Sequence, residues 1–297
     1  MKLGGFGARF RLMPEEFRLL RDLINERAGL HFGDDSMFVF ERRLGDRASA
    51  LGLDGFAAYY KHLRFSPQGA EELELALEVL TTKETYFFRQ EYQLRSFQQE
   101  LLPRLAEANA SQRRLNVWSA GCSTGEEVYT LAILILESGL FEGWDVHVIG
   151  SDLCRSNVAA GRRGVYRPSS FRTTTPLMRQ RYFEERSDGT HVVERLKRFC
   201  HFGQVNLLDA ERARTVGRVD VVFCRNVLIY FDERSRRKVI DTLYDRLVPG
   251  GYLLLGHSES LLHVSTAFEL VHLKEDLVYR KPVSQPRGNS APQRGRS

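Results

Sequence analysis

The sequence is poor in cysteine, and the few cysteines that it has are far apart. Its 297 residues include four of them, with no pair in a C-x-x-C arrangement. A structural zinc site or a disulfide framework needs clustered or regularly spaced cysteines, so we expect neither, and we predict no metal. We expect buried, free thiols, as is usual for isolated cysteines, at Cys122, Cys154, Cys200 and Cys224.

Long hydrophobic runs are also missing. The run Leu131–Leu136 is the longest, far short of the roughly 20 residues that cross a bilayer, and it fits a buried helix. The first residues contain no extended apolar segment of the kind that directs secretion. These absences predict a cytoplasmic protein of one or two domains, without stable membrane insertion.

Positive charge does not dominate the body of the chain, although the net charge is +5. Residues 1–12 carry three Lys/Arg and residues 281–297 carry four, with no acid in either segment, so the rest of the chain has a net charge of −2. This distribution argues against a uniformly basic nucleic-acid binder. Residues 160–200 are locally basic, with ten Lys/Arg against four acids, which fits either a solvated face or a docking surface for an acidic partner.

Helical periodicity fills the first part of the chain. Pro14 suits the first position of a helix and Gly29 suits its end. Further amphipathic segments follow, and no alternating strand pattern precedes Leu115. The sequence therefore predicts a flexible arm over 1–12 and a small all-α domain over 13–90, with helices that include 38–50, 55–64 and 70–80.

After Leu115, short apolar runs alternate with helical stretches. This alternation predicts a parallel sheet that is covered by helices on both faces. The last two runs, FELVHL and LVYRK, predict an antiparallel hairpin at the sheet edge. Residues 164–200 break the alternation and are interpreted as an insertion. We thus predict an α/β domain over 91–281 and a disordered basic tail over 282–297.

The segment Val117–Glu127 predicts a strand, a glycine-containing loop and the first turn of a helix. In doubly wound folds this junction binds ligands, because backbone N–H groups and a helix N-terminus approach them there. The segment has neither the G-x-G-x-x-G pattern nor the lysine of a phosphate-binding loop. Glu126 and Glu127 would repel a pyrophosphate but suit a sulfonium or amino group, which argues against NAD and nucleoside triphosphates.

Polar residues follow three other predicted strands. Asp152 stands where such folds place an acid that accepts hydrogen bonds from ribose hydroxyls, and it could also cap the next helix. Asn206 follows the strand near residue 202, and Arg225 and Asn226 follow VVFC, with Tyr230 one helical turn further on. Such side chains are costly to bury without partners, so we expect them to face a pocket, although Asn226 could instead serve as a cap.

The segment Thr81–Arg89 connects the predicted helical and α/β domains. Phe87 and Phe88 are interpreted as core between these domains. Arg89 beside them would place a positive charge near a cleft, where its guanidinium matches a carboxylate in a bidentate pair.

Together these motifs resemble the CheR family, the chemotaxis receptor glutamate methyltransferases. The resemblance rests on TTKETYFFR, WSAGCSTGEE, GSDL, NLLD, FCRNVLIYFD and PGGYLLLGHSES, in this order, and on the helical stretch ERRLGDRASALGLDGFAAYY. It implies an α/β fold with a class I (Rossmann-like) methyltransferase sheet, an antiparallel terminal hairpin, a small all-α N-terminal domain and a small inserted β-subdomain. It also implies S-adenosylmethionine as methyl donor, S-adenosylhomocysteine as product, and methyl esters on receptor glutamates.

The resemblance further implies the residues of the site. The insert at 164–200 would match the subdomain that grips a receptor C-terminal peptide in some members. Lys83 stands where the family usually has an asparagine at the cofactor, and Val128 replaces a proline, with little expected effect because proline there only pre-sets the backbone. The implied site residues are Thr85, Arg89, Glu126, Asp152, Asn206, Leu207, Arg225, Asn226 and Tyr230.

A direct displacement by glutamate is the hypothesis for the reaction. A free glutamate side chain has a pKa of about 4.3, so it is ionised at neutral pH and needs no general base. In this hypothesis Arg89 orients the carboxylate and Tyr230 donates one hydrogen bond beside the reacting centre. For docking, Arg42, Arg43 and Arg47 form a predicted basic face that suits acidic receptor helices, since residues four apart share a helical face.

Two alternatives remain at this point. A nucleic-acid methyltransferase could use the basic insert and tail, with bases stacking on Tyr166, Phe171, Tyr182 and Phe183. The second alternative is a module that binds the cofactor or the receptor without turnover, and Lys83 is the feature that favours it.

Overall fold

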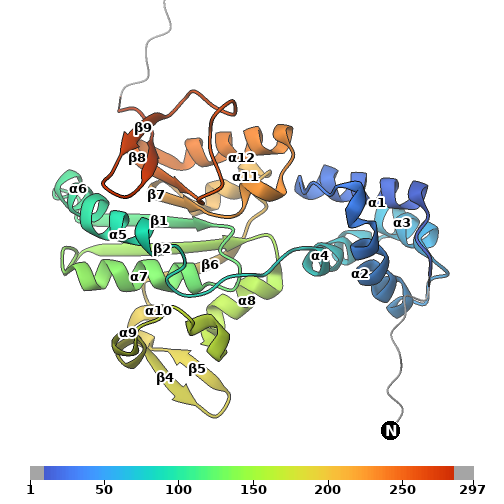
Figure 1. Ribbon diagram of the computed structural model, residues 1–297, viewed down its shortest axis with the longest axis horizontal. Coiled ribbons are helices and arrows are strands. Elements are labelled where there is room, and N and C mark those ends of the chain that lie inside the picture. The colour runs from blue at the N-terminus through green and yellow to red at the C-terminus, as the bar shows by residue number, and fades with distance from the viewer. Residues whose placement is uncertain (1–9, 284–297) are drawn as a thin grey trace, which may run out of the picture.

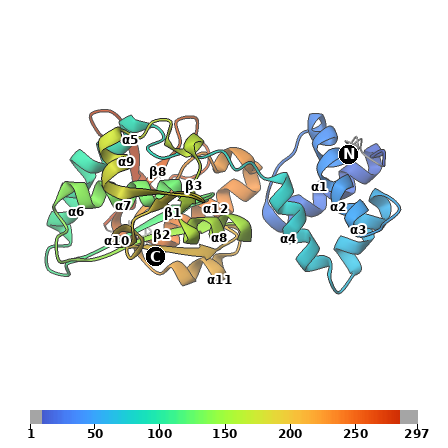
Figure 2. The ribbon, with the colours of Figure 1, turned by 90° about the horizontal axis from the view of Figure 1, so that it is seen from below.

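A bundle of helices stands beside a larger domain built around a β-sheet in the computed structural model, which describes residues 10–283 (Figure 1). The view from below shows the same separation, with one segment running from the bundle to the sheet domain (Figure 2). The predicted arm (1–12) and tail (282–297) lie mostly outside the described residues. Within these residues, no helix is long and apolar enough to cross a membrane.

The first helices agree with the periodicity of the sequence. Helix α1 begins at Pro14 and ends before Gly29, whose φ of 70° is the left-handed conformation that glycine adopts readily. A Cβ at Gly29 would lie 2.8 Å from side-chain atoms of Leu208 and Ser235, so this glycine also lets α1 approach the larger domain closely. The elements are α1 (Pro14–Ala28), η1 (Asp34–Ser36), α2 (Met37–Ala50), α3 (Phe56–Phe65) and α4 (Gly69–Leu80).

Two basic residues of α2, Arg43 and Arg47, form hydrogen bonds to α4. Arg47 Nε donates to Glu72 Oε1 at 2.9 Å, and Tyr59 donates to the same oxygen at 2.7 Å. Arg43 Nη1 donates to the carbonyl of Val79, near the end of α4, at 2.7 Å. These bonds hold Arg47 against α4, whereas Arg43 keeps an exposed surface, so docking of a partner by Arg42, Arg43 and Arg47 stays a prediction. Arg42 is exposed.

The Arg47–Glu72 pair gives a stability prediction. Glu72 has a side chain that is only 5% exposed, and removing one partner of a buried ion pair leaves an uncompensated charge. We expect Arg47→Ala to lower the free energy of unfolding by about 3 kcal/mol. Urea denaturation measures this, and Arg42→Ala on the same helix should change it by less than about 0.5 kcal/mol. Equal effects of the two substitutions would contradict the assignment.

The larger domain contains the predicted sheet. Strand order is β6-β2-β1-β7-β8-β10-β9, and the pairs from β6 through β8 are parallel, whereas β10 is antiparallel to both β8 and β9. The predicted α/β class and terminal hairpin are confirmed. The strands are β1 (Arg114–Ala120), β2 (Asp145–Asp152), β6 (Cys200–Gln204), β7 (Val219–Cys224), β8 (Leu247–Leu255), β9 (Glu269–His272) and β10 (Leu277–Arg280).

Helices cover both faces of this sheet because its strands are apolar on both sides; every residue of β7 is buried. Helix α7 is uninterrupted and almost wholly buried in its middle, as the run Leu131–Leu136 predicted. The covering elements are α5 (Glu91–Ser96), η2 (Phe97–Leu101), α6 (Leu102–Ala108), α7 (Glu126–Ser138), α8 (Arg155–Arg163), α11 (Ala210–Ala213), η4 (Arg214–Val216), η5 (Leu228–Tyr230) and α12 (Glu233–Arg246).

The segment after α8 forms a separate small sheet, with strand order β3-β5-β4. It projects below the main sheet in Figure 1. Phe87 packs into it, with its ring 5.0 Å from that of Phe171, so the prediction that Phe87 lies between the two large domains is wrong. The elements are β3 (Val165–Tyr166), η3 (Pro168–Phe171), α9 (Pro176–Tyr182), β4 (Phe183–Arg186), β5 (Gly189–Val192) and α10 (Glu194–Lys197).

The insert has less unpaired positive charge on its surface than its number of Lys and Arg residues suggests. Five of its eight Lys/Arg form ion pairs, two of them with acids outside the insert, Glu84 and Glu137. The aromatic residues that a nucleic-acid enzyme would use for stacking are buried in the insert, with exposed fractions of 4–6%: Tyr166, Phe171, Tyr182 and Phe183. They are therefore not available to bases.

The helical bundle contacts the carboxyl edge of the main sheet on two sides. On one side, Leu30 forms a β-bridge with Phe231, and Asn25 Nδ2 donates to Asp232 Oδ2 at 2.6 Å. On the other side, the N–H of Ser156 in α8 donates to Glu78 of α4 at 2.8 Å. The space between these contacts is the ligand cavity described next.

Candidate functional site

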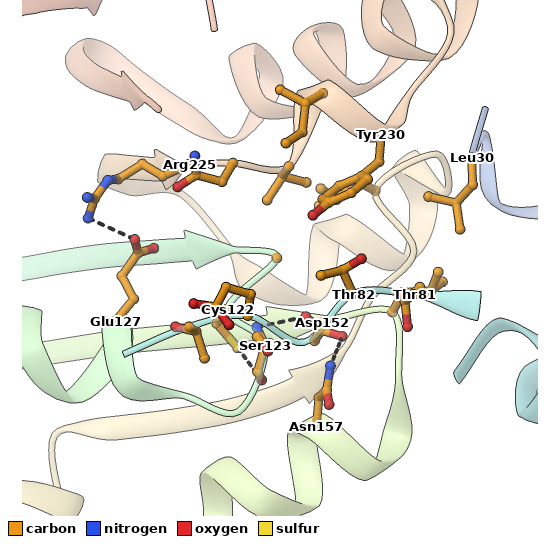
Figure 3. Close-up of a pocket in the computed structure, with 18 of the residues that line it drawn as sticks. Leu30, Thr81, Thr82, Cys122, Ser123, Glu127, Asp152, Asn157, Arg225 and Tyr230 are labelled. Atoms are coloured by element: carbon orange, nitrogen blue, oxygen red, sulfur yellow. Dashed lines mark hydrogen bonds and ion pairs between the residues drawn. The ribbon is translucent and has the colours of Figure 1, made fainter. Parts of the chain in front are cut away.

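A cavity of about 370 Å³ lies at the carboxyl ends of the parallel strands. It falls within the roughly 300–1,000 Å³ range of small-molecule sites. Residues from the helical bundle close one side, and the connecting segment 81–89 crosses it. Its other walls are the loops after β1, β2, β6 and β7, some of whose side chains are drawn in Figure 3.

The loop after β1 packs tightly against the loop after β7. Gly121 has a φ of 81°, and a Cβ there would lie 2.5 Å from Val227 Cγ2, so only glycine fits. Ser123 follows with a φ of 49°, and its N–H donates to Asp152 Oδ2 at 2.8 Å. Ser123 Oγ is buried and has no hydrogen-bond partner within the described structure.

Asp152 stands at the end of β2, where the sequence predicts the ribose acceptor. Its Oδ1 accepts from the N–H of Cys154 and from Asn157 Nδ2, both at 2.9 Å. The bond to residue i+2 is an Asx turn, so Asp152 orders the loop before α8 and is not the N-cap itself, which is Cys154. A carboxylate offers about four acceptor sites, so one remains for a ligand in the cavity.

The two glutamates at the start of α7 point to different places. Glu127 lines the cavity, whereas the predicted ligand residue Glu126 does not. Glu126 is 3% exposed and accepts hydrogen bonds from Thr124 and from Ser170 of the insert. Burial raises its pKa. Successive helical residues point about 100° apart, and Glu127 is the one that lines the cavity, while contact of Glu126 with the cofactor stays a prediction.

Arg225 lines the cavity, but its N–H groups donate hydrogen bonds to other residues of the protein. Its Nη1 donates to Glu127 Oε2 at 3.1 Å, and its Nε donates to Gln90 Oε1 at 3.2 Å. A further bond reaches the backbone carbonyl of Arg89. Its side chain is 2% exposed. Arg225 therefore ties the connecting segment to α7, a different use from the cofactor contact that the sequence predicted.

Asn226 has a φ of 59°, in the left-handed region that asparagine tolerates better than most residues. The residue lines the cavity, and its Oδ1 is buried without a partner within the described structure. A buried acceptor of this kind needs a donor. We expect a ligand in the cavity to supply it.

The connecting segment supplies Thr85 and Arg89 to the cavity wall, as predicted. Arg89 Nη1 donates to the backbone carbonyl of Glu84 at 3.0 Å, and its guanidinium lies 5.8 Å from the Tyr86 ring. Lys83 is exposed, does not line the cavity, and donates to Ser156 at 3.0 Å. The lysine in place of the usual asparagine therefore leaves the cavity open.

The remaining predicted residues also line the cavity. Asn206 and Leu207 form the wall after β6. Asn206 Nδ2 donates to the carbonyl of Arg27 at 2.8 Å, and its Oδ1 accepts from the N–H of Leu208, so its side chain joins the bundle to the sheet domain. Tyr230 is 37% exposed, and Figure 3 shows its ring projecting into the cavity from the side opposite Asp152.

Several lining residues were not predicted to belong to the site. Glu127 follows the predicted residue Glu126, and its pairing with Arg225 joins segments that are 98 residues apart in the sequence. Asn157 lies one turn into α8, behind Asp152. The bundle residues Leu30, His31 and Phe32 have no motif that separates them from ordinary core, so nothing in the sequence could have identified them.

The wall has the chemistry of a site for a cationic ligand with hydroxyl groups. The carboxylates of Glu127 and Asp152 and the unpartnered Asn226 Oδ1 are acceptors. The guanidinium of Arg225 is already paired with Glu127, so Arg225 offers no unpaired charge to a polyphosphate. The ribose hydroxyls, ammonium and sulfonium of S-adenosylmethionine match such a wall. A sheet with this strand order and this cavity at its carboxyl edge defines an S-adenosylmethionine-dependent methyltransferase.

Comparison with known families agrees in both domains. Residues 83–277 match the model described as the CheR methyltransferase SAM-binding domain, and residues 15–81 match the CheR methyltransferase all-alpha domain. The chain belongs to the CheR methyltransferase family. The predicted resemblance and the predicted cofactor are thereby confirmed.

Individual relatives are similar over nearly their whole lengths. Chemotaxis protein methyltransferase 2 of Vibrio cholerae is 33% identical, over 90% of this chain and 93% of the relative. The chemotaxis protein methyltransferase of Salmonella typhimurium is 35% identical, over 88% and 89%. Chemotaxis protein methyltransferase 1 of Pseudomonas aeruginosa is 31% identical, over 89% and 97%.

Proposed function

We propose that this chain forms methyl esters on glutamate side chains of chemoreceptor cytoplasmic helices, as part of adaptation in chemosensory signalling in the cytoplasm. The observation that carries the proposal is the match of both domains, over about 90% of the chain, to relatives named chemotaxis protein methyltransferase. The burial of the insert's aromatic residues disfavours the nucleic-acid alternative, and the position of Lys83 outside the cavity wall removes the feature that favoured a module without turnover.

In this proposal the protein's task is alignment. S-adenosylmethionine, when bound, supplies a methyl group activated by the sulfonium. The glutamate acceptor is already ionised at neutral pH, so it can attack by direct displacement without a general base. Alignment of two reactants can contribute roughly 7–11 kcal/mol. Asp152 would hold the ribose, while Asn226 Oδ1 and Ser123 Oγ would accept from ligand donors that reach them.

Arg89 and Tyr230 are proposed to act on the acceptor side. Part of the Arg89 guanidinium is held by the Glu84 carbonyl, which leaves other N–H groups for a carboxylate. Negative charge disappears as the ester forms, so a grip that is too tight would stabilise the ground state over the transition state. One orienting contact from Arg89 and one hydrogen bond from Tyr230 would hold the carboxylate without binding it too tightly.

Substitution of Arg89 checks this assignment. We expect Arg89→Ala to reduce kcat/KM for receptor methylation by about 10–100-fold, the effect of one charge-assisted hydrogen bond or two. Calorimetry should show S-adenosylhomocysteine affinity within a few-fold of the parent. Arg104→Ala, an exposed arginine of α6, is the matched control and should keep full activity. Full turnover in Arg89→Ala with an intact fold would remove Arg89 from the mechanism.

The substrate itself can be tested with labelled donor. Receptor-containing membranes are incubated with the purified chain and S-adenosylmethionine carrying a tritiated methyl group. Glutamyl methyl esters release the label as volatile methanol in mild base, whereas methylated nitrogen does not. Base-stable label, or label in added RNA and none in receptor, would contradict the proposal.

The receptor contact has two proposed parts. Arg42 and Arg43 are exposed on α2, whereas Arg47 is half-buried beside Glu72, so the first two are proposed to contact the acidic receptor helices. The insert is proposed to hold a receptor C-terminal peptide, and β4 supports this because within the described sheet it pairs on one side alone, with β5. An unpaired strand edge can accept an extended peptide.

A further inference from the structure

The loop after β7 departs from regular structure at the point where it enters the cavity. Asn226 has a positive φ, and the next residues turn into the short helix η5 before they can form sheet hydrogen bonds. Six of its residues line the cavity, and Asn226, Val227 and Ile229 are among them. The backbone N–H groups of Asn226, Val227 and Ile229 need acceptors from outside this loop, whereas the N–H of Tyr230 donates to the carbonyl of Val227.

One side chain supplies these acceptors. Glu259, in the loop after β8, accepts from the N–H of Asn226 through Oε2 at 2.7 Å and from the N–H of Val227 through Oε1 at 2.8 Å. The same oxygens accept from the N–H groups of Gly256 at 2.7 Å and Ile229 at 3.3 Å. Among the described residues, no Lys, Arg or His forms an ion pair with Glu259, so backbone amides alone compensate its charge.

The neighbouring sequence is shaped to admit this carboxylate. A Cβ at Gly256 would lie 2.6 Å from Glu259 Oε2 and 2.8 Å from the Asn226 nitrogen. The N–H of Glu259 donates to the carbonyl of Gly256 at 2.9 Å, which closes a tight turn. Glycine at 256 and glutamate at 259 therefore form one unit that is fitted against the loop after β7.

We infer that Glu259 is a positioning residue for the cofactor site, acting through Asn226 and the loop that leads to Tyr230. Glu259 does not itself line the cavity. Its charge-assisted hydrogen bonds are stronger than neutral ones, and they hold Asn226 in a conformation that asparagine would otherwise populate only in part. Asn226, whose Oδ1 is buried without a partner among the described residues, is then held in a fixed place in the cavity wall. The inference rests on the assigned cofactor, while its extension to Tyr230 rests on the proposed function.

The test uses the full chain and needs no acceptor. Glu259→Gln replaces one acceptor oxygen with an NH₂ group that cannot accept from backbone N–H donors. We expect calorimetry to show about tenfold weaker S-adenosylhomocysteine binding, with the far-UV circular dichroism retained. Ser258→Ala, its exposed neighbour, should bind as the parent does. Unchanged affinity in Glu259→Gln would overturn the inference.

A double-mutant cycle separates positioning from general stabilisation. Asn226→Ala is expected to weaken binding about tenfold by itself. If Glu259 acts through Asn226, the double variant should also be about tenfold weaker than the parent, because the two changes remove the same interaction. Independent, additive losses of about a hundredfold would overturn the inference, since Glu259 would then act by another route.

A second variant covers the case in which Glu259→Gln fails to fold. Gly256→Ala leaves every charge in place but pushes a methyl group against Glu259 and the Asn226 nitrogen. It should weaken S-adenosylhomocysteine binding in the parent and have no further effect in Asn226→Ala. Binding equal to that of the parent would contradict the inference. These measurements are independent of receptor methylation, so a failure of the proposed function would be seen separately, as absent methyl transfer.

Discussion

Replacing Arg225 with methionine should lower the free energy of unfolding by about 3–5 kcal/mol, the usual result of removing one partner from a buried ion pair. The Arg225 side chain is 2% exposed and joins Glu127, Gln90 and the Arg89 carbonyl. Methionine fills much of the space but makes none of these bonds. Glu127 would then be a carboxylate without its cation, and the connecting segment would lose its attachment to the sheet domain.

Urea denaturation with a matched control measures this effect. Arg114→Met removes the arginine of an exposed ion pair with Asp145, and such pairs contribute about 0–1 kcal/mol. The double variant Glu127→Gln, Arg225→Met removes both charges and should recover part of the lost stability. If Arg225→Met costs no more than Arg114→Met, the pair is not the tie that the structure indicates.

Loss of cofactor binding is the expected result of Asp152→Ala. Hydrogen bonds to a charged group contribute about 1.5–3 kcal/mol, so losing the ribose contacts should weaken S-adenosylhomocysteine binding by about 100-fold. The loop bonds to Ser123, Cys154 and Asn157 are lost as well. Asp152→Asn keeps the shape and should lie between the parent and the alanine variant. Calorimetry with parent-like affinity in Asp152→Ala would show that the acid binds no ligand.

The same carboxylate should give binding a dependence on pH. Burial raises the pKa of Asp152 above that of an ordinary aspartate, although the hydrogen bonds from Cys154, Asn157 and Ser123 and the charge of Lys83 oppose the shift. The ionised form is the better acceptor, so affinity should be full above this pKa and fall as the pH drops through it. The affinity of Asp152→Asn should not fall as the pH drops. If it still falls, a group other than Asp152 causes the pH dependence.

The helices, the strands and the place of the site could be predicted because each depends on local pattern. Apolar periodicity gave the helices from Pro14 and the strands from Leu115, and polar residues at strand ends marked the carboxyl edge. The choice between Glu126 and Glu127 could not be made, because it depends on the rotation of α7 about its axis. Likewise, spacing placed Arg43 and Arg47 on one face of α2 without saying that this face meets α4.

Contacts between side chains and backbone groups could not be predicted from the sequence. Glu259 bonds to amides in a loop more than 25 residues away, and any residue type provides such an amide. Arg225 was recognised as a polar residue at a strand end, but its partners include a carbonyl of Arg89. Phe87 was identified as core, and the sequence offered no means to tell that its neighbours belong to the insert.

The connecting segment has two roles, since residues 81–89 both join the two domains and form part of the cavity wall. Leu30, His31 and Phe32 of the bundle complete that wall. Affinity for the cofactor is therefore a property of how the two domains are docked. A receptor that binds the helical bundle and shifts it would change cofactor affinity, and by thermodynamic reciprocity the cofactor would change the affinity for that receptor. The domain interface can thus act as an allosteric link between substrate recognition and the methyl donor.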